Sequence, residues 1–115
     1  MDLVVTTSVV GTASVAAVSG EIDVYTAPTL GEKLTELVDS GPTRIVVDMA
    51  QVGFCDSTGL GALVAAQNYA RERNVALSLA AAQERVIKVL RITGLDQVFT
   101  VHPSVDAATA SASES

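Results

Sequence analysis

Cysteine, aromatic residues and basic residues are all scarce in this chain of 115 residues. The single cysteine, Cys55, excludes an internal disulfide and a cysteine-based zinc site. Two tyrosines, two phenylalanines and no tryptophan leave few rings on which nucleic-acid bases or planar cofactors could stack. Seven basic against thirteen acidic residues give a net charge of −6, which argues against a partner that is nucleic acid or an anionic membrane.

The sequence also lacks a basic start and a long apolar run. Its first basic residue is Lys33, whereas a secretory signal begins with positive charge. Residues 3–20 are uncharged, but they contain six serines or threonines and two glycines, which makes them too polar to span a bilayer. We therefore expect a cytoplasmic protein, and no motif in the sequence indicates a cofactor or a metal ion.

The acidic residues are concentrated in the first half of the chain. Residues 1–56 carry eight acids and two bases, whereas residues 57–115 carry five of each. We expect an acidic surface on the amino-terminal half, which a partner with a basic face would complement.

The length fits one domain, and the apolar pattern predicts alternating strands and helices. The expected strands are residues 3–7, 13–18, 44–49, 75–79 and 99–101. The expected helices run from a cap at Thr26 to Gly41, from 57 to 73 and from 83 to 93, with a last helical turn at 104–108. Residues 49–56 are expected to form a connector, and Gly94 to end the third helix in a left-handed conformation.

This order predicts an α/β domain with a mixed β-sheet, in which an amino-terminal hairpin is followed by βα units and the helices pack on the sheet. The domain is expected to span residues 1–109. The remaining residues, 110–115, are rich in alanine and serine and are expected to form a disordered tail.

The most specific feature is the run Phe-Cys-Asp-Ser-Thr-Gly-Leu-Gly at residues 54–61, where a loop becomes a helix. Serine is a preferred helix cap, so Ser57 has a purely structural interpretation. However, Gly59 and Gly61 each cost a helix roughly 1 kcal/mol relative to alanine, and they leave the serine hydroxyl accessible. A helix amino terminus also stabilises an anion. Ser57 is therefore either a helix cap or a phosphate acceptor.

Three stretches together resemble the anti-sigma factor antagonists, which are single STAS domains of the sporulation and stress-response type. The first is Val-Ser-Gly-Glu-Ile-Asp at residues 18–23, followed by Ala-Pro-Thr-Leu at 27–30. The second joins the apolar strand at 45–48 to the run at 54–61. The third covers residues 86–96 and Phe99. The resemblance extends over residues 3–108.

The resemblance implies a regulatory protein rather than an enzyme. The dephosphorylated protein would bind an anti-sigma factor that is also an ATP-dependent serine kinase, and binding would free a sigma factor for transcription. The kinase would phosphorylate Ser57, the phosphoprotein would dissociate, and a PP2C-type phosphatase would reset it. The partner-binding residues implied in this way are Glu21, Asp23, Asp56, Thr58, Gly59 and Leu60.

Simpler roles stay open for several of these residues. Asp56 either orients Ser57 or caps the helix, and Thr58 also completes its first turn. Glu21 and Asp23 are either solvated turn residues or partner contacts. Cys55 fits a buried small hydrophobic residue, with a redox role as the alternative because it lies two residues before Ser57. His102 has no nucleophile or metal ligand beside it in the sequence and receives no role.

Three rival functions can be compared with this one. A serine hydrolase needs Gly-x-Ser-x-Gly, and Cys55 occupies the first glycine position. A phospho-aspartate receiver needs an acidic pair after the first strand, where Thr6, Thr7 and Ser8 stand instead. A STAS scaffold or transporter accessory subunit without phosphorylation remains the alternative.

Overall fold

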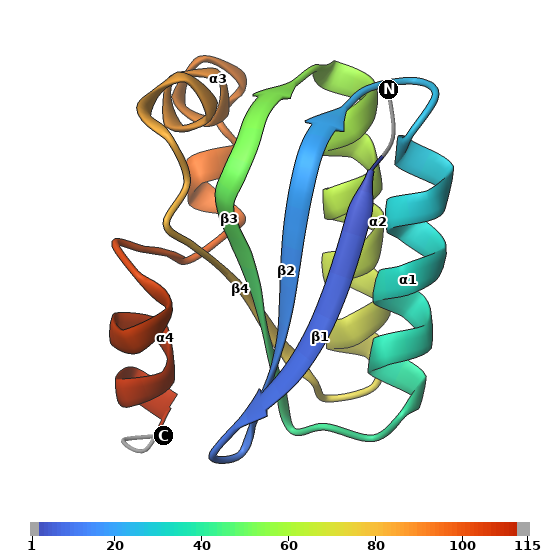
Figure 1. The fold of residues 1–115 in the computed structure, drawn as a ribbon, viewed down its shortest axis with the longest axis vertical. Helices are drawn as coiled ribbons and strands as arrows, with labels where there is room; N and C mark the ends of the chain where they lie inside the picture. The colour runs from blue at the N-terminus through green and yellow to red at the C-terminus, as the bar shows by residue number, and fades with distance from the viewer. Residues whose placement is uncertain (1–2, 113–115) are drawn as a thin grey trace.

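The computed structural model describes residues 3–112, which fold around one five-stranded sheet (Figure 1). The strands lie side by side in chain order: β1 (Val4–Val10), β2 (Ala13–Ile22), β3 (Arg44–Cys55), β4 (Ala76–Ala80) and β5 (Val101–His102). β1 is antiparallel to β2, and every other neighbouring pair is parallel. The predicted mixed sheet with an amino-terminal hairpin is confirmed.

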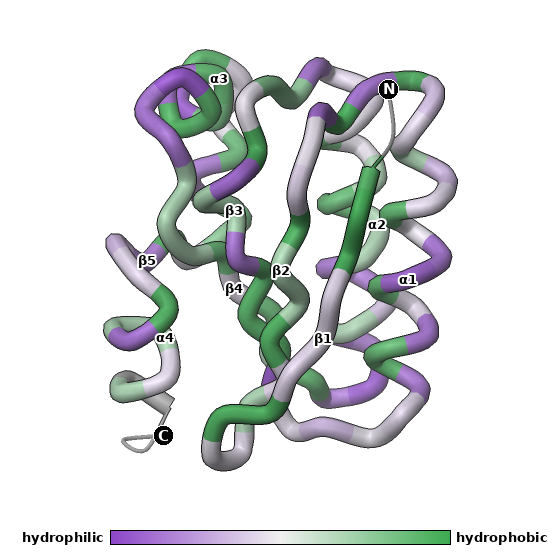
Figure 2. The backbone as a smooth tube through the Cα atoms, viewed as in Figure 1, coloured by the Kyte–Doolittle hydropathy of each residue, from purple (hydrophilic) through white to green (hydrophobic). Residues whose placement is uncertain are grey.

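The helices cover both faces of this sheet. They are α1 (Ala27–Asp39), α2 (Ser57–Glu72), α3 (Glu84–Thr93) and α4 (Val105–Ala112), with a 3₁₀ turn η1 (Leu95–Gln97). α1 and α2 lie together on one face, and α4 lies on the other (Figure 1). In Figure 2 the central strands are largely hydrophobic and α1 carries hydrophilic stretches. Cover on both sides explains why β3 begins as a nearly continuous apolar run.

Alternating side chains of β3 divide the core into two parts. Ile45 and Val47 are fully buried in the main core beneath α1 and α2. Val46, between them, belongs to a smaller cluster with Ala13 of β2 and Ala108 of α4. Each fully buried Val or Ile side chain contributes about 1.5–3 kcal/mol.

The predicted hairpin turn and the predicted end of α3 are both formed by a glycine with a positive φ angle. Gly11 turns the hairpin between β1 and β2 with φ +61°. Gly94 ends α3 with φ +78°, and its N–H donates to the carbonyl of Arg91. Leu95 then packs against the main core, as expected beside a left-handed cap.

The predicted connector at residues 49–56 is wrong for most of its length, because β3 continues to Cys55. Met49, Val52 and Cys55 are buried, and they keep this half of the strand on the core. Its partner β2 continues to Ile22, beyond the predicted end at residue 18. The pairing slips after Ala17 and again after Gly20, which hides the two-residue alternation of a regular strand.

The remaining boundaries shift by a few residues. β1 reaches Val10 rather than residue 7, and β5 is Val101–His102 rather than residues 99–101. α4 continues to Ala112, so residues 110–112 of the expected tail are helical. The rest of that tail, residues 113–115, lies outside the described residues, and the domain limit at residue 109 stays a prediction.

Candidate functional site

The carboxyl ends of β2 and β3 lie beside each other where α2 begins (Figure 1). The pairing places Glu21 opposite Phe54 and Ile22 opposite Cys55. The backbone N–H of Asp56 then donates to the carbonyl oxygen of Ile22 at 3.1 Å. Two motifs that are some thirty residues apart in the sequence therefore form one surface, and Asp23 follows directly on its β2 side.

Asp56 is the residue that caps α2. Its backbone is extended, with φ −92° and ψ −177°, and its Oδ1 accepts a hydrogen bond from the N–H of Gly59 at 2.8 Å. This geometry is that of a standard N-cap. Asp56 is therefore the cap of α2, as one of its predicted alternatives states, and Ser57 is not the cap.

Ser57 is the first residue of α2, and its side chain is exposed. Within residues 3–112, its hydroxyl makes no hydrogen bond. Thr58 is exposed beside it. The backbone N–H groups of both residues point out of the first turn, where a helix has no internal acceptor for them. A free hydroxyl thus lies at the positive end of a 16-residue helix.

Gly59 allows α2 to approach the sheet closely. A methyl group added there would lie 2.5 Å from Cγ2 of Ile22, 2.8 Å from the Ile22 carbonyl oxygen and 3.1 Å from Sγ of Cys55. Leu60 follows with 2% of its surface exposed, in the main core. Gly59 and Leu60 therefore fix the position of the helix terminus, and the Leu60 side chain faces inward.

Asp23 shapes the turn between β2 and α1. Its Oδ1 accepts hydrogen bonds from the N–H groups of Tyr25 at 2.9 Å and Thr26 at 3.1 Å. The Thr26 hydroxyl donates to the carbonyl of Glu21 at 2.8 Å. Thr26 stands at the N-cap position of α1 but makes no side-chain cap bond, because its hydroxyl is used in this turn. The predicted capping by the Thr26 side chain is therefore wrong.

Three exposed apolar side chains lie in the same two stretches of chain, in the β2–α1 turn and at the end of β3. Tyr25 is 87% exposed, Val24 is 55% exposed and Phe54 is 43% exposed. We call these three residues the apolar rim. Sequence reasoning missed them, although two large apolar residues in a strand–helix turn are themselves a signal, since turns are usually polar.

Cys55 is buried beneath this surface, with 3% of its area exposed. Burial, followed by the negative charge of Asp56, raises the pKa of its thiol to about 12. The thiol is therefore protonated at neutral pH and is a poor nucleophile. Cys55 acts as a small hydrophobic residue, as predicted, and the redox alternative loses its chemical basis.

Among residues 3–112 no three His, Cys, Asp or Glu side chains are grouped so that they could hold a metal ion. No helix in the same range is long and apolar enough to cross a membrane.

Comparison with known families gives a match to the STAS domain over residues 4–108. The chain belongs to the STAS-domain family. The resemblance inferred from the three sequence stretches is confirmed. This STAS domain is 37% identical over 84 residues to the anti-sigma-B factor antagonist of Bacillus subtilis, an alignment that covers 73% of this chain and 76% of that protein.

Solved structures agree with this assignment. The crystal structure of an anti-sigma factor antagonist from Mycobacterium paratuberculosis has a TM-score of 0.85 and 31% identity, covering 95% of this chain and 93% of that one. The anti-sigma factor antagonist SpoIIAA in its unphosphorylated form has a TM-score of 0.80 at 18% identity, covering 97% and 98%. Its phosphorylated form, described as a Bacillus cell fate determinant, has a TM-score of 0.71, also at 18% identity, covering 95% and 99%. At 18% identity the likeness to SpoIIAA shows the fold alone.

Proposed function

We propose that this STAS domain is an anti-sigma factor antagonist that switches partners through Ser57. Its unphosphorylated form binds an anti-sigma factor that is an ATP-dependent serine kinase, and a sigma factor is thereby freed for transcription. Phosphorylation of Ser57 ends the interaction, and a PP2C-type phosphatase restores it. The protein acts in the cytoplasm by binding rather than by catalysis, in a stress-response or sporulation type of regulation.

The observation that carries this proposal is the division of roles between Asp56 and Ser57. Asp56 supplies the helix cap, so the Ser57 hydroxyl is exposed and has no structural bond to lose. A kinase could transfer the γ-phosphoryl group of ATP to this oxygen without disturbing the fold. The product phosphate would lie at the positive end of α2, beside the unpaired N–H groups of the first turn, where an anion is stabilised.

The surroundings of Ser57 supply a surface for a protein partner. The apolar rim offers exposed apolar area of the kind that protein interfaces bury. Glu21, Asp23 and Asp56 add negative charge, which suits a basic partner face. In this proposal these residues and Thr58 contact the partner directly, while Gly59 and Leu60 contribute by fixing the helix terminus.

Phosphorylation would act against the same interface. A phosphate group adds about −1.5 to −2 charges and several bulky oxygens next to Asp56. An interface that buries a neutral hydroxyl would then have to desolvate a charged group, which is strongly unfavourable. We therefore expect the switch to be local, with loss of binding and no change of fold.

A capture experiment with matched baits tests the proposal. The wild type, Ser57→Ala and Ser57→Asp are used as baits in native lysate, with Ser8→Asp as a control. Ser8 is exposed on β1 and pairs with Val15, far along the sheet from Cys55, so it adds the same charge away from the site. Bound proteins are identified by mass spectrometry, and the captured kinase is then incubated with ATP and each bait.

The expected result is that wild type, Ser57→Ala and Ser8→Asp retain an ATP-binding anti-sigma factor, while Ser57→Asp loses it. Phosphate incorporation should occur in wild type and Ser8→Asp and be absent in Ser57→Ala. Retention of the same proteins by all four baits would contradict the proposal. It would instead support a constitutive scaffold or a transporter subunit.

A further inference from the structure

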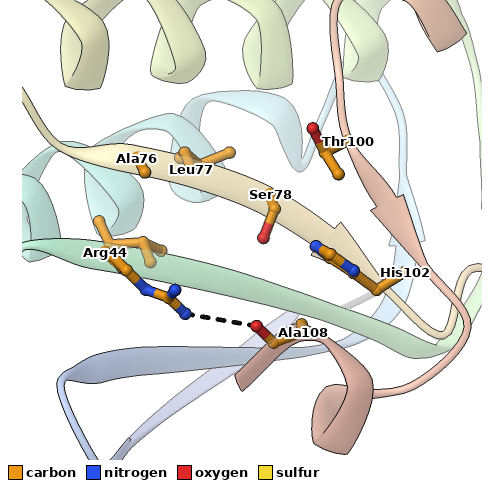
Figure 3. Close-up of a pocket in the computed structure, with 8 residues that line it drawn as sticks. Arg44, Ala76, Leu77, Ser78, Thr100, His102 and Ala108 are labelled. Carbon is orange, nitrogen blue, oxygen red and sulfur yellow. Dashed lines mark hydrogen bonds between the residues drawn. The ribbon is translucent and has the colours of Figure 1, made fainter. Parts of the chain in front are cut away.

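A cavity of about 220 Å³ lies on the face of the sheet that α4 covers, and it is distinct from the Ser57 site (Figure 3). Arg44 stands at the first residue of β3, whereas Cys55 stands at the last. The near end of the cavity, at His102, is level with Asp48 in β3. Cys55 follows seven residues later, so at about 3.3 Å per residue the two sites are roughly 20 Å apart along the strand. The cavity is lined by Arg44, Ile45, Ala76, Leu77, Ser78, Thr100, His102 and Ala108.

The strand register explains why the cavity exists. Ser78 pairs with Val46 in β3, and His102 pairs with Ala80 in β4, so both side chains share the face on which Val46 meets α4. Ala76, which pairs with Arg44, fills little space. Figure 3 shows the Ser78 hydroxyl and the His102 ring directed toward the space beside the Arg44 guanidinium.

Arg44 is the unusual member of this group. One terminal nitrogen of its guanidinium donates to the Ala108 carbonyl at 3.3 Å. Its Nε is buried and has no hydrogen-bond partner among the described residues. Nor does any described carboxylate lie within 4 Å of the guanidinium, although the chain has thirteen acidic residues and seven basic ones. A buried donor of a charged group without an acceptor is costly, and native proteins seldom leave one unmatched.

We propose that this cavity binds a phosphate-sized oxyanion. The Arg44 guanidinium supplies the positive charge and the free Nε donor, and the Ser78 hydroxyl and the His102 ring supply donors from two further strands. Every lining side chain is cationic, hydroxylic, apolar or imidazole, and none is acidic. The volume is far larger than the roughly 10–15 Å³ that one ordered water requires. The site accommodates either free phosphate or the phosphate group of a small organic phosphate.

Occupation would also affect how α4 is attached. α4 is held by the packing of Val105 and Ala108 on the sheet and by the Arg44 hydrogen bond. An oxyanion that bonds Arg44, Ser78 and His102 would link β3, β4 and β5 beneath this helix. Binding should therefore raise the thermal stability of the domain, and the increase should grow with the logarithm of ligand concentration once that concentration exceeds the dissociation constant.

The test is a titration of the isotope-labelled full chain, followed by amide NMR at constant ionic strength with sodium chloride as the reference salt. The probes are inorganic phosphate and glycerol 3-phosphate. We expect saturable shifts at Ser78, Thr100 and His102 with either probe, and the tighter one identifies the source of the phosphate group. Arg44→Met should weaken binding at least tenfold. Arg85→Met removes the same charge from an exposed position on α3 and should leave binding unchanged.

Ser78→Ala provides a second test that does not depend on Arg44→Met folding normally. This variant should weaken phosphate binding several-fold while keeping the charge of the cavity. The proposal is overturned if the shifts do not saturate, if they centre on residues 57–59 instead, or if Arg44→Met and Arg85→Met bind phosphate equally.

Discussion

Replacing Gly59 with alanine should destabilise the domain, whereas the same change two residues later should not. Both glycines lie in the first turns of α2, where alanine is favoured by up to about 1 kcal/mol per residue. At Gly61 a new methyl group meets nothing within 4 Å. At Gly59 it would lie 2.5 Å from Cγ2 of Ile22 and 2.8 Å from the Ile22 carbonyl oxygen. A side chain can rotate away, but the carbonyl oxygen belongs to the paired end of β2.

The size of the effect follows from three contributions. Overpacking of this kind costs about 1–3 kcal/mol. Moving α2 away also stretches the bond from the Asp56 N–H to Ile22, which contributes about 1 kcal/mol. The gain in helix propensity offsets part of this loss. We expect Gly59→Ala to lower the free energy of unfolding by about 1–3 kcal/mol and Gly61→Ala to raise it by up to about 1 kcal/mol.

The assay is urea unfolding of both variants and the wild type, followed by circular dichroism. The difference between the two variants is the decisive quantity, because the propensity gain is common to both and cancels. It should be about 2–4 kcal/mol in favour of Gly61→Ala. Equal stabilities for the two variants would refute the argument that Gly59 is needed for close approach of α2 to β2.

Three further predictions concern neighbouring residues. Asp56→Ala should lower the free energy of unfolding by about 1 kcal/mol through loss of the N-cap, and Asp56→Asn should retain most of it, as measured by urea unfolding. Ser57→Ala should leave the free energy of unfolding unchanged within about 0.5 kcal/mol. Ser57→Asp should raise it by a few tenths of a kcal/mol, because a negative charge is favourable in the first helical turn. A loss of about 1 kcal/mol or more in Ser57→Ala would mean that the Ser57 hydroxyl is structural. Cys55 should resist iodoacetamide at pH 8 in the folded protein and react after unfolding. The pKa of the Cys55 thiol is raised to about 12 in the folded protein, well above the usual value near 8.5. The neutral thiol therefore contributes its full stability below about pH 8.5, and this contribution declines as the pH rises toward 12. Cys55→Ala should lack this decline of the free energy of unfolding with pH.

The sequence predicted the elements whose signals are local. The hairpin at Gly11 and the end of α3 at Gly94 follow from residues that tolerate positive φ, and both are present. The second half of β3 was missed because its recognition depends on pairing. The register with β2 slips twice, so its buried residues do not alternate as in a regular strand. Only the neighbouring strand shows that residues 49–55 are extended.

The site was predicted in part for a similar reason. Asp56 and Ser57 are both good caps, and they stand one residue apart, so the sequence does not decide between them. In the structure the bond from the Asp56 N–H to Ile22 keeps Asp56 extended, and helical geometry begins one residue later. The cavity at Arg44 was not predicted at all, because it forms only when β4, β5 and α4 come together.

The close packing of α2 against β2 has a consequence for the rate at which a partner binds. The surface around Ser57 is built on two paired strand ends and a long helix, and Gly59 leaves no space between them. A partner that docks here meets a preformed surface, so we expect no slow conformational step before association. The association rate should then be governed by diffusion and by the acidic charge of this face, falling as salt concentration rises. Changes at Ser57 should act mainly on how long the complex survives.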